Sequence, residues 1–260
     1  MGKTKNNLIN FFIITIFLSW VFWTLSILIN RNIISIGSNT NILHILGAFI
    51  PSLIGIYFIY RGNDKKSVIE FLKKGIDYKF DLKYYLYLFI FPLILLISYF
   101  ISGLFLELNL EDSLLNEPKM IPIAFVYILI LGGPLGEEYG WRGFALPRLN
   151  MIFKPLYSSI ILGFIWSIWH LPLFFMEGST QQGINYFGYT IFTILIAIIF
   201  TILFIKTGGS ILAAILFHTM VNLGWGIFPV FYNLSASIIV LVLLSIVTIS
   251  LVYNNREIMV

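Results

Sequence analysis

Residues 131–144 read LGGPLGEEYGWRGF, and here two adjacent carboxylates and an arginine interrupt a chain that is otherwise almost continuously apolar. Of the 260 residues, 59% are hydrophobic and 11% are charged, and the mean hydropathy is +0.93. A soluble domain carries about a quarter charged residues. The sequence therefore predicts an all-α, polytopic membrane protein in which Glu137, Glu138 and Arg142 lie at membrane depth.

Apolar runs long enough to cross a bilayer, which takes about 20 residues per helix, recur on both sides of this stretch. The first run is too long for a signal peptide and is expected to remain as the first span. No stretch is left for a soluble domain, so we expect residues 1–260 to form a single integral membrane domain, a bundle of eight transmembrane helices. The predicted helices are residues 8–29, 41–60, 84–106, 120–146, 156–176, 187–205, 209–230 and 234–253.

The Lys and Arg residues favour one orientation of these spans. With a cytoplasmic N-terminus, the basic loops lie inside, and only Arg31 and Lys119 lie outside together with the acidic linker 107–119 and the loop 176–187. We therefore predict a multi-pass protein of the cell membrane with both termini in the cytoplasm. The net charge of +4 reports this orientation and does not indicate a nucleic-acid partner. Richness in Ile, Asn and Lys indicates a bacterial source.

One basic loop contains SVIEFLKKGI, residues 67–76, which has helical spacing and basic flanks. Two interpretations of this segment stay open. It suits a short helix lying on the inner leaflet, and it equally suits a solvated linker.

Few ionisable side chains fall inside the predicted spans. A charge at membrane depth is costly and usually faces a bundle interior or a water-filled cavity, so each one is a candidate functional residue. The candidates are Glu137, Glu138, Arg142, His170, His218 and His44. We interpret His44 as a structural histidine, because no motif surrounds it. The tryptophans Trp141, Trp166, Trp169 and Trp225 are interpreted as packing or interface residues.

The two glutamates are expected to have different neighbours. Each residue of an α-helix turns roughly 100°, so Glu138 and Arg142 share a face while Glu137 points away from the arginine. Glu138 and Arg142 are predicted to pair, and whether that pair only orders the site stays open. Gly136 and Gly140 form a GxxxG spacing, which lets a second helix approach beside the carboxylates.

Four polar side chains from three predicted helices are available to face one interior space: Glu137, His170, His218 and Asn222. An imidazole beside a carboxylate suits general-base activation of water. A second imidazole with an amide one helical turn away suits stabilisation of an oxyanion. Glu137, His170 and His218 also suit a zinc ion with an open coordination position. Both arrangements favour hydrolysis, and the choice between them stays open.

The complete absence of cysteine limits the chemistry further. Disulfides, thiolate nucleophiles and zinc bound by cysteine are all excluded. Any catalysis must therefore use histidine, carboxylate, amide or hydroxyl groups.

In these motifs the sequence resembles the CPBP intramembrane proteases, which include CAAX prenyl endopeptidases and bacterial proteins linked to bacteriocin processing and self-immunity. The family pattern is EExxxR, then FxxxH, then HxxxN or HxxxB, each on a separate helix. Residues 137–142, EEYGWR, match the first motif, and residues 218–222, HTMVN, match the third. In the middle motif, Trp166 stands four residues before His170, where the pattern has Phe. The resemblance is detailed over about residues 120–230, the motif-bearing core.

The resemblance implies an intramembrane endopeptidase that acts on a peptide or membrane-protein substrate in the lipid bilayer. Glu137 with His170 would activate the attacking water, and His218 with Asn222 would bind the oxyanion, supported by Glu138 and Arg142. The family is commonly called a metalloprotease, and a metal-free glutamate mechanism is also argued for it. Zinc held by Glu137, His170 and His218 is therefore the cofactor to test.

Two other function classes use the same residues. A catalytically silent relative would act as a membrane scaffold or as a bacteriocin self-immunity protein by binding a partner. A proton-coupled transporter would use the buried glutamate and histidines as a proton relay. The transporter fits less well, because transporters often show repeated halves with paired broken helices and the sequence contains no evident repeat.

Overall fold

The computed structural model describes residues 2–34, 40–62, 65–108 and 113–260, and every regular element in these ranges is helical. The longer helices are α1 (Gly2–Asn30), α2 (Thr40–Gly62), α4 (Ile90–Gly103), α5 (Ile121–Leu131), α8 (Pro155–Trp169), α9 (Tyr186–Lys206), α10 (Ile211–Ile227) and α11 (Leu234–Asn254). The short helices are α3 (Lys65–Lys73), α6 (Pro134–Glu138), α7 (Leu146–Asn150) and α12 (Arg256–Met259). The 3-10 segments are Leu82–Phe89, Leu114–Asn116, Pro118–Met120, Leu171–Phe175 and Val230–Tyr232, and Tyr139–Ala145 is a π-helix.

The chain is an all-α polytopic membrane protein. In the described residues, seven helical runs are long and apolar enough to cross a membrane. They are 5–30, 40–62, 82–103, 118–150, 155–175, 186–206 and 234–254. The remaining predicted span, 209–230, corresponds to α10, a shorter apolar helix whose residues are mostly buried inside the bundle. Each of the eight predicted spans therefore has a helical counterpart.

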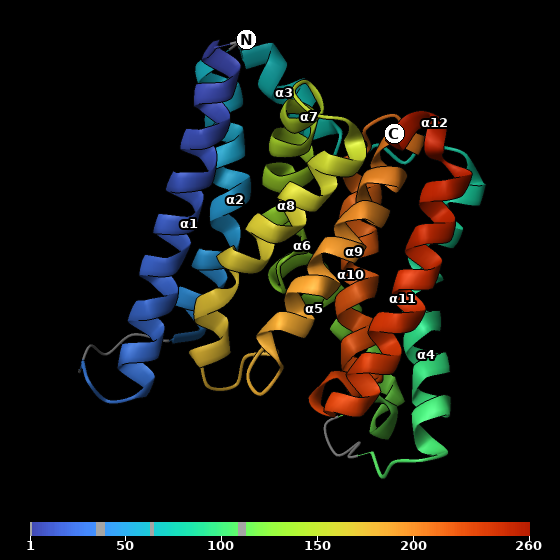
Figure 1. Ribbon diagram of the computed structural model, residues 1–260. Helices are drawn as coiled ribbons and strands as arrows, with labels where there is room; N and C mark the ends of the chain where they lie inside the picture. The colour runs from blue at the N-terminus through green and yellow to red at the C-terminus, as the bar shows by residue number, and fades with distance from the viewer. Residues whose placement is uncertain (1, 35–39, 63–64, 109–112) are drawn as a thin grey trace.

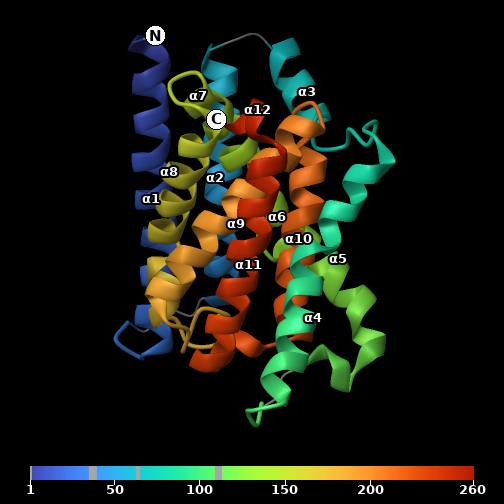
Figure 2. The same cartoon turned by 45° about the vertical axis from the view of Figure 1, so that its right-hand side comes forward.

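The helices form one bundle with both termini at the same end (Figure 1). α1 packs along α2, and α8 packs along α9, while α10 contacts α4, α5, α6 and α9. α5 stands at the margin of the bundle (Figure 2) and carries no fully buried residue. α10 is therefore a central helix, and α5 is a peripheral one.

The segment 67–76, for which a helix or a linker was considered, begins as helix α3. Its C-terminal end is held against the bundle, because the Tyr139 hydroxyl donates to the Leu72 carbonyl at 2.7 Å. The Lys74 carbonyl also accepts from the backbone N–H groups of Ile211 and Leu212 at the start of α10. These contacts hold the loop that contains α3, which is predicted to lie in the cytoplasm, against α10 and the segment that carries Tyr139.

The prediction of one continuous helix over 120–146 is wrong. α5 ends at Leu131, α6 begins at Pro134, and a π-helical turn follows over Tyr139–Ala145. Gly133 has φ +112°, a backbone conformation that residues with a side chain rarely adopt. Pro134 has no backbone N–H and cannot continue the helical hydrogen bonds of α5. The sequence Gly-Gly-Pro therefore breaks the helix immediately before the two glutamates.

The predicted close approach at Gly136 and Gly140 is confirmed, and the approaching helix is α2. A Cβ atom on Gly136 would lie 2.7 Å from the Ala48 carbonyl oxygen, and one on Gly140 would overlap the Pro51 carbonyl. Ser52 of α2 also donates to the Leu135 carbonyl at 3.0 Å. Backbone contact with α2 thus fixes the depth and rotation of the carboxylate-bearing segment.

Candidate active site

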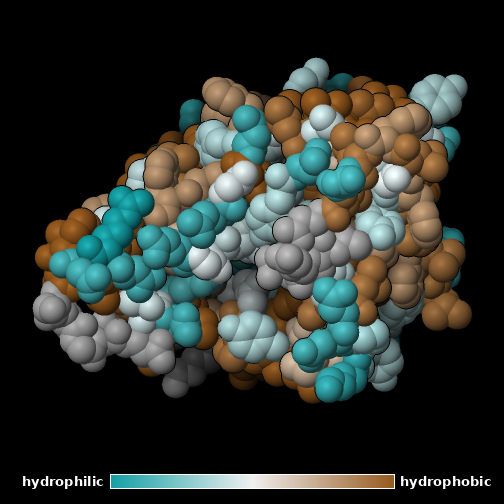
Figure 3. Space-filling model, turned by 90° about the horizontal axis from the view of Figure 1, so that it is seen from below, coloured by the Kyte–Doolittle hydropathy of each residue, from teal (hydrophilic) through white to brown (hydrophobic). Residues whose placement is uncertain are grey.

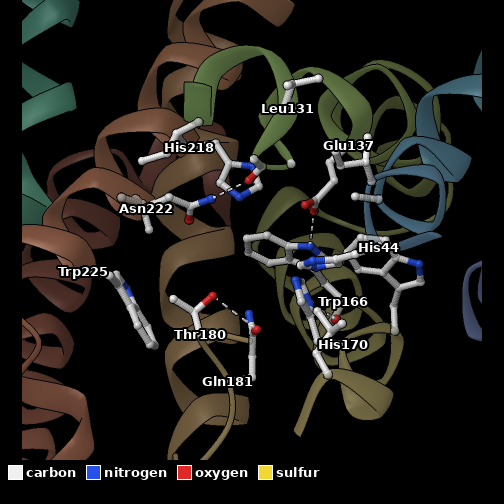
Figure 4. Close-up of a pocket in the computed structure, with 18 of the residues that line it drawn as sticks. His44, Leu131, Glu137, Trp166, His170, Thr180, Gln181, His218, Asn222 and Trp225 are labelled. Atoms are coloured by element: carbon white, nitrogen blue, oxygen red, sulfur yellow. Dashed lines mark hydrogen bonds between the residues drawn. The ribbon is translucent and has the colours of Figure 1, made fainter. Parts of the chain in front are cut away.

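A cavity of about 320 Å³ lies inside the bundle and brings the polar candidates together. Its lining includes Glu137, His170, His218 and Asn222, which come from α6, the end of α8, and α10 (Figure 4). The rest of the wall is mostly aromatic and aliphatic: Trp23, Ile45, Ala48, Tyr127, Ile128, Leu131, Trp166, Trp169, Leu173, Tyr189, Phe192, Val221 and Trp225. The cavity is therefore a largely apolar chamber whose inner end holds the polar side chains of the site.

Glu137 is 4% exposed and projects into this chamber from the first turn of α6. Its Oε2 accepts a hydrogen bond from Trp166 Nε1 at 2.8 Å (Figure 4). A buried carboxylate needs donors to offset its desolvation. The indole N–H supplies one donor and holds the carboxylate in place, while Oε1 remains without a side-chain partner among the hydrogen bonds of this site.

Glu138 turns away from the chamber, as the helix geometry predicts, and is completely buried. Its Oε1 accepts from Arg142 Nη1 at 2.8 Å, so the predicted ion pair is confirmed. The same oxygen lies 2.8 Å from Nδ1 of His218, 80 residues further along the chain. The Arg142 guanidinium lies over the Phe200 ring at 3.7 Å, which shields the pair from lipid.

These contacts set the orientation of His218. A carboxylate paired with arginine is ionised and can only accept, so Nδ1 of His218 is the donor in its bond to Glu138. Nε2 is then the nitrogen available to the chamber, which His218 lines. Glu138 therefore has a role that the sequence did not indicate, because it orients a histidine on another helix.

His170 follows α8 directly and is oriented by its own helix. Its Nδ1 lies 2.8 Å from the backbone oxygen of Trp166, one turn earlier. A carbonyl only accepts, so Nδ1 carries the proton and Nε2 of the neutral ring has a free lone pair. The ring is enclosed by Trp166, Trp169 and Tyr189 at centroid distances of 5.4, 4.6 and 5.5 Å.

Asn222 lines the chamber one turn beyond His218, and its Nδ2 donates to the Gly132 carbonyl at 3.2 Å. This bond connects α10 to the break between α5 and α6. The amide has two N–H groups, and the second one is not used by this bond. Figure 4 shows His218 and Asn222 on one side of the chamber and Glu137 on the other, with His170 below Glu137.

Comparison with known proteins matches residues 119–224 to a family described as type II CAAX prenyl endopeptidase Rce1-like. The chain is also 28% identical over 189 residues to CAAX prenyl protease 2 of Methanococcus maripaludis, which covers 68% of this chain and 69% of that protein. These similarities support the resemblance of the chain to the CPBP family. A further similar protein is lysostaphin resistance protein A of Staphylococcus haemolyticus, 27% identical over 66% of this chain and 46% of that protein.

The CPBP pattern and this chain differ at Trp166, and the structure gives that difference a consequence. Phenylalanine at this position would fill a similar space but would leave Glu137 without the indole N–H. From the sequence, a packing role is predicted for Trp166 and this contact is not. The sequence does contain one indication of such a contact. The indole of Trp166 is an N–H donor one helical turn before His170, on the same helix face.

Two further residues of the chamber were missed. His44 lines the wall, and its backbone carbonyl accepts from Trp23 Nε1 at 3.0 Å. Gln181 lines the chamber from the loop after the Leu171–Phe175 segment. No motif surrounds either residue, so only the packing of the bundle reveals that they line the same chamber as Glu137.

The residues present do not fit the zinc site considered from the sequence. Among the described residues, no three His, Asp or Glu side chains are placed to hold a metal ion. The arrangement gives a zinc ion no set of three converging ligands.

Proposed function

We propose that this protein is an intramembrane endopeptidase that hydrolyses a peptide bond by a metal-free mechanism. The observation that carries this proposal is the convergence of Glu137, His170, His218 and Asn222 on one chamber within the membrane bundle. The similarity to type II CAAX prenyl endopeptidases supports a peptide or protein substrate.

In the proposed reaction, Glu137 is the general base and His170 Nε2 helps to orient the attacking water. Glu137 takes one proton from the water, and the hydroxide adds to the carbonyl carbon of the scissile bond. His218 and Asn222 donate to the resulting oxyanion. The proton on Glu137 then passes to the departing amine nitrogen as the C–N bond breaks, which restores the carboxylate.

Glu138 and Arg142 are positioning residues in this mechanism. For His218 to donate through Nε2 while Nδ1 donates to Glu138, the imidazole must carry both protons. The buried carboxylate of Glu138 provides the negative charge that such an imidazolium requires. Arg142 in turn keeps Glu138 ionised by pairing with the same oxygen.

We also propose that both termini lie in the cytoplasm. The end of the bundle that holds the termini carries most of the exposed basic side chains of the described residues: Lys5, Arg61, Lys66, Lys73, Lys74, Lys79, Lys83, Lys154, Lys206 and Arg256. Arg31 and Lys119 are the basic residues described at the other end. Basic residues beside membrane spans favour the cytoplasmic side.

The proposed activity is tested with cells that produce either the wild-type protein or Glu137→Gln. The amide keeps the shape of the carboxylate and can still accept from Trp166, but it cannot act as a base. Proteomic comparison of membrane peptides should reveal cleavage products that are present only with the wild type, at equal levels of folded protein. A phenotype that persists unchanged in Glu137→Gln would instead favour the catalytically silent scaffold.

A further inference from the structure

The chamber opens toward the end of the bundle opposite the termini. Glu137 and His218, at 4% and 3% exposed, mark its inner end near the middle of the bundle. Thr180 and Gln181 border it at the far end, on the loop between the Leu171–Phe175 segment and α9, and Thr180 is exposed. Figure 3 looks onto this end of the molecule, where the surface is hollowed near its centre.

The two ends of the bundle differ in their number of exposed Lys and Arg side chains. The end with the termini carries the exposed basic residues named above, including Lys73, Lys74 and Lys206. Among the described residues, the end with the opening carries only two basic side chains, Arg31 and Lys119, beside the exposed carboxylates Glu107, Glu117 and Glu177. This asymmetry puts the basic end in the cytoplasm and therefore puts the opening of the chamber on the outer side.

We propose that the chamber takes its substrate from the extracytoplasmic side of the membrane. This inference rests on the proposed function and specifies which substrates reach the site. They are polypeptides whose scissile bond is presented outside the cytoplasm, such as an exported peptide or the outer end of a membrane span. A protein tail that stays in the cytoplasm would approach the closed, basic end of the bundle.

The wall of the chamber indicates the chemistry of that polypeptide. Trp23, Tyr127, Trp169, Phe192 and Trp225 offer broad apolar surfaces, and no Lys or Arg side chain lines the chamber among the described residues. Thr180 and Gln181 place a hydroxyl and an amide at the opening, where the main chain of an extended peptide can form hydrogen bonds. The chamber therefore suits an extended, apolar stretch with bulky side chains.

Labelling of single cysteines tests the direction of the opening, and the chain is suited to it because it contains no native cysteine. Thr180→Cys at the opening, Glu177→Cys on the same loop and Lys154→Cys at the opposite end are each produced in intact bacterial cells. A membrane-impermeant maleimide should label Thr180→Cys and Glu177→Cys directly. Lys154→Cys should be labelled only after permeabilisation or in inverted vesicles. The opposite pattern, or a Thr180→Cys that is labelled from neither side, overturns the proposal.

A second experiment separates this inference from the proposed activity. The probe is a quenched fluorescent peptide with a central apolar stretch and charged ends that prevent it from crossing the bilayer. Wild-type protein in spheroplasts should cleave the peptide, inverted vesicles should not, and detergent-solubilised protein should cleave it in either case. Glu137→Gln should be inactive in all three preparations.

The outcomes distinguish the two ideas. Cleavage by solubilised protein and by inverted vesicles, but not by spheroplasts, would retain the protease and reject an extracytoplasmic substrate. External labelling of Thr180→Cys without cleavage by solubilised wild-type protein would retain the outward opening and count against the protease.

Discussion

At the scale of single residues, the contact between Trp166 and Glu137 has the most direct consequence for chemistry. A hydrogen bond to a charged group contributes about 1.5–3 kcal/mol, so without it a smaller share of the protein should hold Glu137 ionised and in position, and kcat of the proposed reaction should fall by up to roughly a hundredfold. We predict this decrease for Trp166→Phe, which keeps an aromatic ring in the same space. Steady-state kinetics on purified protein would measure it.

Trp141→Phe is the matched control. Trp141 is also fully buried, but its Nε1 has no hydrogen-bond partner and it does not line the chamber. The same substitution there should leave kcat close to the wild-type value. If both variants lost activity equally, the hydrogen bond to Glu137 would not be the cause.

Glu138→Gln should reduce the amount of folded protein in membranes, because it leaves the buried guanidinium of Arg142 without its charge partner. Breaking a buried pair in this way costs about 3–5 kcal/mol, whereas replacing both partners by apolar residues is often neutral. The double variant Glu138→Leu/Arg142→Met should therefore recover much of the folded level. It should remain poorly active, because His218 has lost the acceptor for its Nδ1 proton. Recovery of activity together with abundance would show that the pair is purely structural.

Asn222→Ala should lower kcat by roughly a hundred- to a thousandfold with little change in KM, the usual effect of losing one oxyanion donor. The folded level must be measured in parallel, because Asn222 also bonds the Gly132 carbonyl. A rise in KM at unchanged kcat would assign Asn222 to substrate binding instead.

At the scale of elements, the break between α5 and α6 positions Glu137. A Cβ atom on Gly133 would lie 2.6 Å from Glu137 Oε1, so any side chain there displaces the carboxylate. We predict that Gly133→Ala loses both stability, by about 1–3 kcal/mol for the strained φ, and most of its activity. Thermal unfolding in detergent and the peptide assay measure the two effects separately.

Gly178→Ala is the control for the backbone strain that any side chain causes at positive φ. Gly178 also has positive φ, +75°, but a Cβ there would meet no atom within 4 Å. Its substitution should cost stability without the loss of activity expected for Gly133→Ala. Equal loss of activity in both variants would mean that general destabilisation, and not displacement of Glu137, is responsible.

At the scale of the whole molecule, the donor set of the chamber favours the proposed metal-free mechanism. Since no three carboxylate or imidazole groups of the described residues converge on a metal position, activity of the purified protein should persist in a strong chelator. Elemental analysis should find zinc well below one equivalent. One equivalent of tightly bound zinc, lost together with activity in His218→Ala, would contradict the metal-free mechanism.

Much of the architecture is readable from the sequence because it depends on local properties of the chain. Long apolar runs predict membrane-spanning helices. Inside a bilayer every backbone N–H and C=O group must be hydrogen-bonded within the protein, and only helices and closed barrels achieve this. The pair Glu138–Arg142 follows from a spacing of four residues, and the glycines at 136 and 140 predict a close helix approach. Gly132-Gly133-Pro134 is a helix-breaking sequence, but the apolar run continues on both sides of it and favours one unbroken span.

The partners of the site residues were decided only by the tertiary structure. Trp166 binds Glu137 across 29 residues, His218 binds Glu138 across 80 residues, and Asn222 binds Gly132 across 90 residues. Each contact depends on the depth and rotation at which α8 and α10 pack against α6, and no spacing along one helix encodes these quantities. The sequence by itself therefore determined the membrane bundle and the residue types available for hydrolysis. The packing of the helices decided which carboxylate faces the chamber with Trp166 and which one orients His218.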